Sequence, residues 1–192
     1  MNSLITKRNK TIFTTIKVSM NNSIFKVYTD GACTNNGKSN AKCSIGIHFP
    51  DSNFKQIPDI SKFLNVPKAS NNVAELTAIK DALEIIREHK ILSQVNLYTD
   101  SMYSKNTIEK WYPSWVKQNI VHKKKNSELI TELYKVYSAV NEHNNINLVY
   151  IKAHTGFQDE DSIGNSIADE LATKALKFEN KTIERPQDLW MR

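Results

Sequence analysis

One tripeptide occurs twice, each time at the end of a short apolar segment, and this repetition constrains the fold more than any other feature. The sequence reads Tyr28-Thr29-Asp30 and, seventy positions later, Tyr98-Thr99-Asp100. Residues 24–30 and 95–99 have the alternation and apolar content of β-strands. We expect these strands to be parallel neighbours, which places both aspartates at the carboxyl end of a sheet, where open α/β sheets bind their ligands.

Two further acids lie on predicted helices. Glu75 belongs to the helix predicted over 71–89 and shares its inward stripe with Ile79 and other apolar residues. A buried acid costs several kcal/mol unless its charge is compensated, by estimates of roughly 2–7 kcal/mol for polar groups alone. Asp169 is predicted early in a helix over 163–178, where the positive end of the helix dipole favours an ionised carboxylate.

Four acids delivered to one place indicate a metal site. Ionised carboxylates that cluster repel each other, and a proton, a basic partner or a metal ion relieves the repulsion. No Lys or Arg within these motifs is placed to pair with all four acids. Oxygen ligands without His or Cys favour magnesium or manganese over zinc. Each acid taken singly is equally typical of a helix cap or a surface charge, but the four together favour a two-metal hydrolytic site.

The predicted elements alternate between strands and helices. We expect strands at 24–30, 41–49 and near 54–57 that form an antiparallel meander, with a turn at Asn35-Asn36-Gly37. A helix over 71–89, capped by Asn71 or Asn72, follows. The remaining predicted elements are a strand at 95–99, helices over 101–111 and 128–144, a strand at 146–151 and a helix over 163–178. Pro113 is expected to stop or bend the helix before it. Strands separated by helices must be parallel, so the predicted α/β fold is a five-stranded mixed sheet flanked by helices.

Length and charge predict one domain with short extensions. The 192 residues carry a net charge of +6, and no acid precedes Asp30. We expect a folded domain over 23–180, a basic leader over 1–22 that is either flexible or a targeting peptide, and a tail over 181–192. Cys33 and Cys43 fit free thiols in a reducing compartment, which favours an intracellular protein. No apolar run is long enough for a bilayer, so we expect no membrane partner.

Five motifs together resemble the type 1 ribonuclease H family in order, spacing and flanking chemistry. They are YTDGACTNNG, SNNVAEL, YTDSMY, IKAHTG and GNSIADELA, and the resemblance covers residues 24–177. It implies the ribonuclease H-like fold and an endoribonuclease that hydrolyses the RNA strand of RNA/DNA hybrids, leaving 5′-phosphate and 3′-hydroxyl ends. It also implies two magnesium ions, with manganese as a substitute, held by Asp30, Glu75, Asp100 and Asp169. No obligate protein partner is implied, and we expect a monomer.

The segment after His154 departs from the family pattern. By resemblance, His154 assists proton handling or product release. The family's compact HxGxxGN is lengthened here by five residues to HTGFQDEDSIGN, which adds Asp159, Glu160 and Asp161. This acidic run either slows the approach of substrate, recruits a further cation or points away from the site. Ser166 also stands where the family often has Glu.

The resemblance also implies a substrate-binding surface. Several asparagines match amide positions that contact the two strands near the cut, and two tryptophans with the following lysines resemble the family's basic protrusion that grips the DNA strand. Asparagine is also a common turn or cap residue, and tryptophans four apart on a helix often pack in a core. The residues concerned are Asn36, Asn71, Asn72, Asn126, Trp111, Trp115, Lys117, Lys123, Lys124 and Lys125.

Three alternatives share the fold. A ribonuclease H module of a reverse transcriptase is disfavoured because the chain has its own Met1 and no polymerase segment. An integrase or transposase nuclease would place its catalytic Glu late, whereas Glu75 is early. A non-catalytic hybrid-binding protein would be expected to lack one of the four acids. Cleavage of hybrid, duplex RNA, duplex DNA and single strands distinguishes the three.

Overall fold

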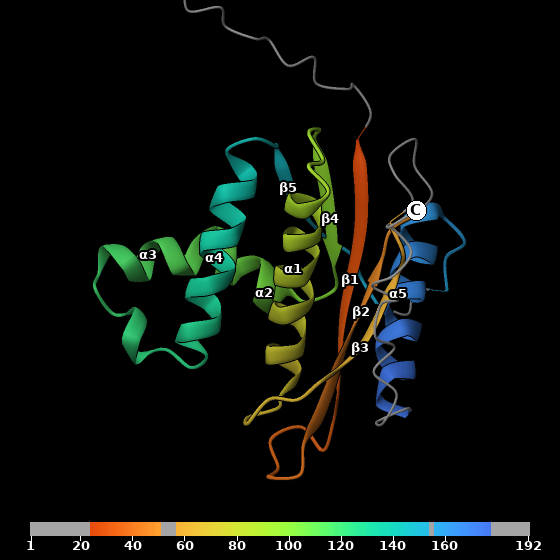
Figure 1. The fold of residues 1–192 in the computed structure, drawn as a ribbon. Helices are drawn as coiled ribbons and strands as arrows, with labels where there is room; N and C mark the ends of the chain where they lie inside the picture. The colour runs from red at the N-terminus through yellow and green to blue at the C-terminus, as the bar shows by residue number, and fades with distance from the viewer. Residues whose placement is uncertain (1–23, 51–56, 154–155, 178–192) are drawn as a thin grey trace, which may run out of the picture.

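The computed structural model describes residues 24–50, 57–153 and 156–177 (Figure 1). Its sheet has the strand order β3-β2-β1-β4-β5. The strands are β1 Phe25–Thr34, β2 Lys42–His48, β3 Ile60–Leu64, β4 Val95–Thr99 and β5 Ile146–Tyr150, and the α-helices are α1 Asn71–Glu88, α2 Met102–Asn106, α3 Tyr112–Lys117, α4 Ser127–Asn141 and α5 Glu160–Lys177. None of the described helices has the length and apolar character that a membrane span requires.

The register of the sheet confirms the predicted mixed topology. Strands β1, β2 and β3 pair antiparallel, whereas β1, β4 and β5 pair parallel. Tyr28 pairs with Tyr98, and Thr29 pairs with Thr99. The repeated tripeptide therefore lies side by side on two adjacent strands, and the predicted fold class is confirmed.

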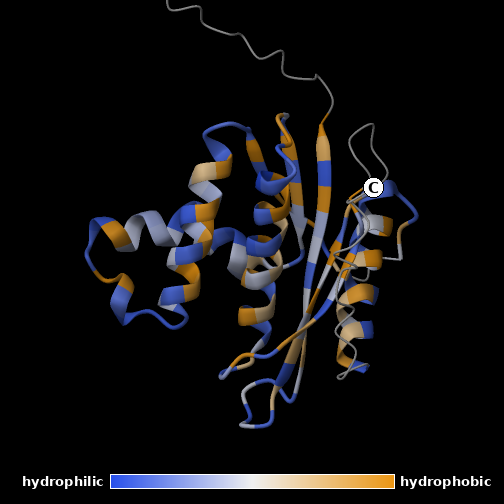
Figure 2. Ribbon diagram, viewed as in Figure 1, coloured by the Kyte–Doolittle hydropathy of each residue, from blue (hydrophilic) through white to orange (hydrophobic). Residues whose placement is uncertain are grey.

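Helices cover the two faces of the sheet unequally. On one face α1 packs against β1 and β2, and α4 packs on α1, whereas α5 is the one described helix that packs on the other face (Figure 1). The main core lies on the α1 face and contains fully buried Leu76, Ile79 and Leu83. Hydrophobic residues accordingly concentrate on the strands and on the helix surfaces that face them (Figure 2). On the α5 face the buried apolar cluster found among the described residues is small and comprises Tyr28, Tyr98 and Ala168, with partly buried neighbours.

Two details of the first half of the chain were predicted wrongly. The third strand is Ile60–Leu64, and of the stretch predicted near 54–57 only Ile57 is described, outside any strand. Pro58 follows directly and has no N–H for a β-ladder, which favours a strand that begins after it. The cap of α1 is Ser70, whose hydroxyl accepts the N–H of Val73 at 3.3 Å, and not an asparagine.

Of the two outcomes expected at Pro113, a stop or a bend of the helix, the stop is wrong. A π-helical turn at Thr107–Trp111 joins α2 to α3, and Pro113 lies in the first turn of α3. Proline is common in the first turn of an α-helix, because its fixed φ already fits the helical conformation. The π-helical turn changes the hydrogen-bond pattern just before the proline, and the helical conformation continues to Lys117.

The last helix begins earlier than the periodicity predicted. Helix α5 starts at Glu160, so Asp169 lies in its third turn, and the argument that the helix dipole favours this carboxylate is wrong. The carboxylate of Asp159 accepts the N–H of Ser162 at 3.0 Å and its hydroxyl at 2.7 Å, which is the geometry of an N-cap. The predicted leader 1–22 and tail 181–192 lie outside the described residues.

Candidate active site

Asp30 and Asp100 meet because their two strands end at different points. Asp100 directly follows the end of β4 at Thr99, as predicted. Asp30 is not at the end of its strand, because β1 continues to Thr34 and pairs with β2 up to that residue. Since β4 stops at the level of Thr29, the side of β1 beyond that level is open toward β4. The two carboxylates lie at this opening.

Glu75 reaches the same place from α1, through a close contact between the helix and β1. It is 4% exposed. A Cβ atom on Gly31 would lie 2.6 Å from the carbonyl carbon of Ala74, so only glycine allows the helix this near to the strand. Because Gly31 has no side chain, α1 can approach β1 closely enough for Glu75 to lie beside the two aspartates.

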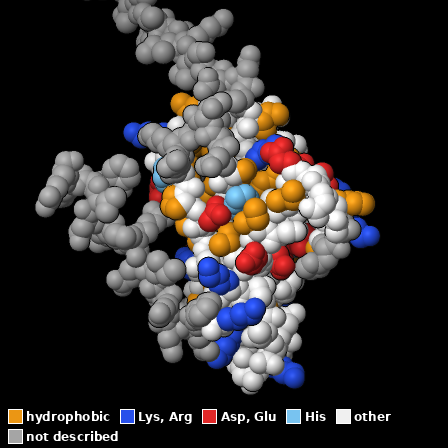
Figure 3. Space-filling view, turned by 90° about the vertical axis from the view of Figure 1, so that its right-hand side faces the viewer, with side chains coloured by type: hydrophobic (Ala, Val, Ile, Leu, Met, Phe, Trp, Pro, Cys, Tyr) orange, Lys and Arg blue, Asp and Glu red, His pale blue; other side chains and the backbone are white. Residues whose placement is uncertain are grey.

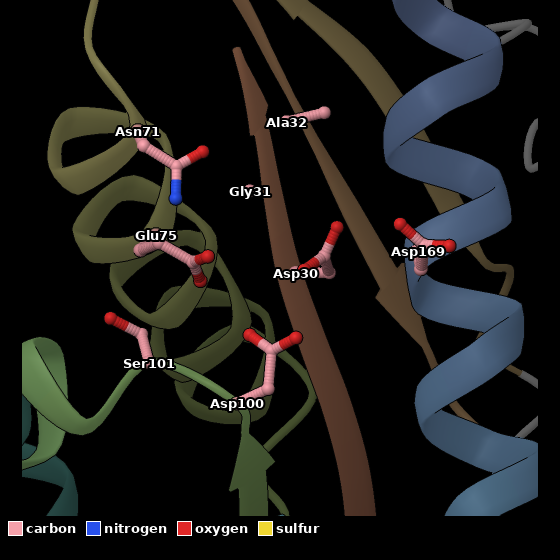
Figure 4. Close-up of a pocket in the computed structure, with 8 residues that line it drawn as sticks. All are labelled: Asp30, Gly31, Ala32, Asn71, Glu75, Asp100, Ser101 and Asp169. Carbon is pink, nitrogen blue, oxygen red and sulfur yellow. The ribbon is translucent and has the colours of Figure 1, made fainter. Parts of the chain in front are cut away.

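Three of the four predicted acids form one tight group. Carboxylate oxygens of Asp30, Glu75 and Asp100 all lie within 4.8 Å of one another. Asp169 is not part of that group, but it faces Asp30 from α5 across the same pocket (Figure 4). The pocket is lined by Asp30, Gly31, Ala32, Asn71, Glu75, Asp100, Ser101 and Asp169.

Burial and mutual repulsion make this group costly to ionise. Burial, followed by the negative charges of Asp100 and Asp169, raises the pKa of Asp30 to about 7. Burial and then the charges of Asp30 and Asp100 raise the pKa of Glu75 well above its usual range, against a smaller lowering by the N–H of Gly31. Glu75 Oε2 is buried without a hydrogen-bond partner. These oxygens fit a hard divalent cation, which would supply the missing partner and the compensating charge.

The predicted residues around the pocket are placed unequally. Asn71 lines the pocket, and its N–H donates to the side-chain oxygen of Asn36 at 3.2 Å, which ties the β1–β2 turn to the start of α1. Asn72 is half-buried and is not among the lining residues. His154 lies outside the described residues.

The tryptophans and lysines form a separate surface around α3. The rings of Trp111 and Trp115 stack at 6.1 Å, and Lys124 Nζ lies 5.0 Å from the Trp115 ring. Trp111 is 37% exposed, whereas Trp115 packs partly against the core. Lys117, Lys123 and Lys125 are exposed, and Asn126 adopts a left-handed conformation before α4 with its Nδ2 buried and unpartnered. None of these residues lines the carboxylate pocket, and α3 lies away from it (Figure 1).

Gly31, Ala32 and Ser101 line the pocket but were not predicted as site residues. Each directly follows or nearly follows one of the two repeated aspartates, so adjacency was the available signal. Gly31 in particular was identifiable as a position where another backbone approaches a strand closely.

The fold and the pocket define a class of protein. A mixed α/β sheet that presents buried, clustered carboxylates beside its parallel strands is suited to hold hard divalent cations, and clustered oxygen ligands of this kind serve hydrolysis of phosphate esters.

Comparisons with known proteins specify the class further. The sequence model of the family described as RNase H matches residues 22–177. A "Probable ribonuclease H" of Acanthamoeba polyphaga mimivirus is 36% identical over 160 residues, which span 79% of this chain and 66% of that relative. The "Ribonuclease H" of Orientia tsutsugamushi (strain Boryong) is 31% identical over 153 residues, which span 80% of this chain and 82% of that protein.

Solved structures agree on the fold. The PFV RNase H domain superposes with a TM-score of 0.62 at 23% identity, over 79% of this chain and 93% of that one. RNase H1 of the archaeon Halobacterium salinarum NRC-1 superposes with a TM-score of 0.53 at 17% identity, over 81% and 98% of the two chains. The chain belongs to the ribonuclease H family. Family membership identifies it as a hydrolytic nuclease of the kind that acts on RNA/DNA hybrids, and the acidic group suits the metal dependence of such enzymes.

Proposed function

We propose that this protein is an endoribonuclease that cuts the RNA strand of RNA/DNA hybrids with two magnesium ions, leaving 5′-phosphate and 3′-hydroxyl ends. The ions would be held by Asp30, Glu75, Asp100 and Asp169. One observation carries the proposal: three carboxylate oxygens lie within 4.8 Å of one another, and Glu75 contributes a buried oxygen that no hydrogen bond satisfies. Manganese satisfies the same oxygen ligands and is the proposed substitute.

When bound, two such ions generate a nucleophilic water and stabilise the leaving oxygen. The chain's own residues supply rigidity and charge. Asp30 lies within a paired strand, and Glu75 is fixed on a helix whose inward stripe is fully packed. Positive charge in the pocket would lower the pKa of both acids and keep them ionised as ligands. All four acids come from one chain, so we propose that a monomer is competent for hydrolysis.

Substrate recognition is proposed for two surfaces. Asn36, Asn71 and Asn72 lie at or near the pocket, where uncharged amides distinguish a ribose 2′-hydroxyl by hydrogen bonding. The stacked tryptophans with Lys117, Lys123, Lys124 and Lys125, and with Asn126 beside them, are proposed to hold the DNA strand through its phosphates. His154 is proposed to assist proton handling or product release at the pocket rim.

A cleavage assay tests the proposal directly. The wild-type protein is incubated with Mg²⁺ and a defined hybrid, duplex RNA, duplex DNA or single strands, and the ends of the products are analysed. We expect cleavage of the hybrid only. Asp100→Asn should lower turnover about 10³-fold or more, a loss of roughly 4 kcal/mol of transition-state stabilisation, while hybrid binding persists. Glu88→Gln, which removes an exposed acid from the end of α1, is the control.

Turnover of Asp100→Asn within tenfold of wild type would refute the metal assignment. Equal cleavage of duplex DNA would instead favour an integrase-like or transposase-like nuclease. Binding of hybrid without cleavage would favour a non-catalytic hybrid-binding protein.

A further inference from the structure

Asp161, in the acidic run that lengthens the segment after His154, is bound to strand β1. Its Oδ1 accepts the hydroxyl of Tyr28 at 2.8 Å and the ammonium of Lys26 at 3.0 Å. The same ammonium lies 3.0 Å from Glu160 Oε2. The first turn of α5 is therefore tied to the strand that carries Asp30.

The other charges of the acidic run are also used within the protein. Asp159 caps α5 through Ser162, and Glu160 pairs with Lys26 although its side chain is 70% exposed. Partial burial alone would raise the pKa of Asp161, but hydrogen bonds from Tyr28 and Lys26 outweigh it and lower the pKa. On the face that α5 covers, acidic side chains lie at several separate places with hydrophobic side chains between them (Figure 3). The contacts of Asp159, Glu160 and Asp161 with other residues of the protein therefore favour a structural role for these acids over repulsion of the substrate.

The facing residues of β1 and α5 form a series, here called the ladder. At one end Asp161 contacts Lys26 and Tyr28, and at the other end Asp169 faces Asp30 at the proposed metal site. Lys26, Tyr28 and Asp30 share one face of β1, because side chains alternate along a strand. Asp161 and Asp169 are eight residues apart on α5, a little more than two turns, so their side chains point about 80° apart around the helix axis. Asp161 contacts β1, and Asp169 faces Asp30 across the pocket. Helix and strand run in the same direction (Figure 1). The four residues from Lys26 to Asp30 extend about 13 Å, and the eight from Asp161 to Asp169 rise about 12 Å, so the two ends of the ladder match.

Between these ends, α5 lies unusually close to the sheet. A Cβ on Gly164 would come within 2.5 Å of the Tyr28 ring, and one on Gly46 would overlap the backbone of Ala168 and Ala172. Past Asp169, the hydroxyls of Ser61 and Ser44 donate to the carbonyls of Leu171 and Ala172 at 2.7 and 2.5 Å. Asp169 therefore lies between two anchored parts of one helix.

Asp169 is the one of the four acids that lies on α5, so its position follows the position of that helix. It lies outside the group formed by the other three carboxylates, and its negative charge acts on Asp30. Repulsion between the two carboxylates, when both are ionised, opposes their close approach, and a bound cation would offset it. An anchor two turns before Asp169 holds α5 against this repulsion.

We propose that Asp161, held by Tyr28 and Lys26, is a positioning residue that sets the distance of Asp169 from Asp30 and so the affinity of the site for divalent cations. This inference rests on the proposed function, because it takes Asp169 to be a metal ligand. Asp161 itself is not proposed to touch the ions or the substrate.

Three single variants and a matched control probe the contact between Asp161 and β1. Asp161→Ala removes the contacts with Tyr28 and Lys26 together with a weaker one from Tyr98. Asp161→Asn keeps an oxygen that accepts from Tyr28, and Tyr28→Phe removes that one hydroxyl donor while keeping the ring that packs on Gly164. Asp159→Asn is the matched control: it removes the same charge from the same run and keeps an oxygen for the cap, but it does not contact β1. Binding of Mn²⁺ alone is measured by titration calorimetry, and kcat and KM for a hybrid are measured as functions of Mg²⁺ concentration.

For Asp161→Ala we expect Mn²⁺ binding weakened about 3- to 10-fold, a matching rise in the Mg²⁺ concentration needed for half-maximal kcat, and an unchanged KM for the hybrid. Tyr28→Phe and Asp161→Asn should shift in the same direction by less. Tyr28→Phe should add nothing to Asp161→Ala, and Asp159→Asn should match wild type.

Three results would overturn the positioning role. The first is unchanged Mn²⁺ binding in Asp161→Ala and Tyr28→Phe, and the second is an effect on KM alone. The third is an equal effect of Asp159→Asn, which would show that the acidic run acts through its total charge and not through the contact of Asp161 with β1. Asp169→Asn separates this failure from failure of the proposed function. If it retains Mn²⁺ binding and turnover, Asp169 is no ligand, whereas if it loses both while Asp161→Ala does not, only the positioning role is wrong.

Discussion

Glu75 and Asp169 reach one pocket from opposite faces of the sheet, on helices that are held in different ways. Helix α1 buries large apolar side chains, among them Leu76, Ile79 and Leu83. The buried residues of α5 are small or polar: Ser162, Gly164, Asn165, Ala168, Ala172 and Ala175. A fully buried leucine or isoleucine contributes about 1.5–3 kcal/mol, and alanine much less.

The difference between the two helices shows what fixes the position of each acid. Apolar burial is non-directional and strong, so α1 holds Glu75 in place despite the cost of its charge. Close backbone approach and single hydrogen bonds are directional and weaker, so the position of α5 depends on particular contacts at both ends. We therefore expect substitutions on the α1 face to act on stability or on chemistry outright, and substitutions of the contacts that hold α5 to act in smaller steps.

Glu75→Gln should have the largest effect and should separate chemistry from stability. The amide removes a ligand charge, so turnover should fall about 10³-fold or more, as for loss of roughly 4 kcal/mol of transition-state stabilisation. The metal-free protein should unfold at the same temperature as wild type or higher, because a buried acid with a raised pKa is no longer present. Hydrolysis rates and thermal unfolding in EDTA measure the two effects. A strongly destabilised variant would contradict this account of the α1 face.

Leu83→Ala should destabilise the α1 face by about 2–5 kcal/mol, since Leu83 is fully buried and the change leaves a cavity. Urea unfolding measures the loss. Leu92→Ala, at a leucine that is 42% exposed, is the control and should cost far less. If both variants lost the same stability, the assignment of the main core to this face would fail.

The metal-free protein should lose stability as pH rises from about 4 to about 7. The pKa of Asp30 is about 7 in the folded protein and 3.8 in an ordinary environment, so across this window the folded state binds more protons than the unfolded state. Asp30→Asn removes this contribution and should flatten the dependence by a few °C in Tm. Unfolding in EDTA at pH 5 and 7.5 measures it. Identical pH dependence in both proteins would show that Asp30 is not the source.

Ser61→Ala should have the smallest effect, a loss of about 1 kcal/mol, because one hydroxyl to the carbonyl of Leu171 is removed from the α5 face. Thermal unfolding measures it, with Ser39→Ala in an exposed turn as control. A loss as large as that of Leu83→Ala would erase the contrast between the two faces.

Much of the fold was predictable because its signals are local. Strand β4 occupies the residues that alternation indicated, and the turn at Asn35 and Gly37 has the positive φ values that such residues favour. The third strand was misplaced because a short apolar stretch before Pro58 resembled it. The start of α5 was missed because its acidic first turn has no apolar period, although acids at that place are typical of a helix start.

The site was predictable to a similar degree. The repeated tripeptide and the inward stripe of α1 were sufficient to bring Asp30, Asp100 and Glu75 together, and the structure groups their oxygens. Asp169 was identified from its motif, but the physical reason first assigned to it was wrong, because a helix that begins at Glu160 leaves it far from the dipole's positive end.

The sequence by itself determined which residues form most of the strands and which helix face carries an acid, because alternation and helical period are properties of nearby residues. Only the tertiary structure decided how far β1 runs past β4, how close Gly31 allows α1 to come, and that Asp161 binds Tyr28. The last contact joins residues 133 positions apart. Such contacts depend on the packed arrangement of all the elements between them, which no local pattern contains.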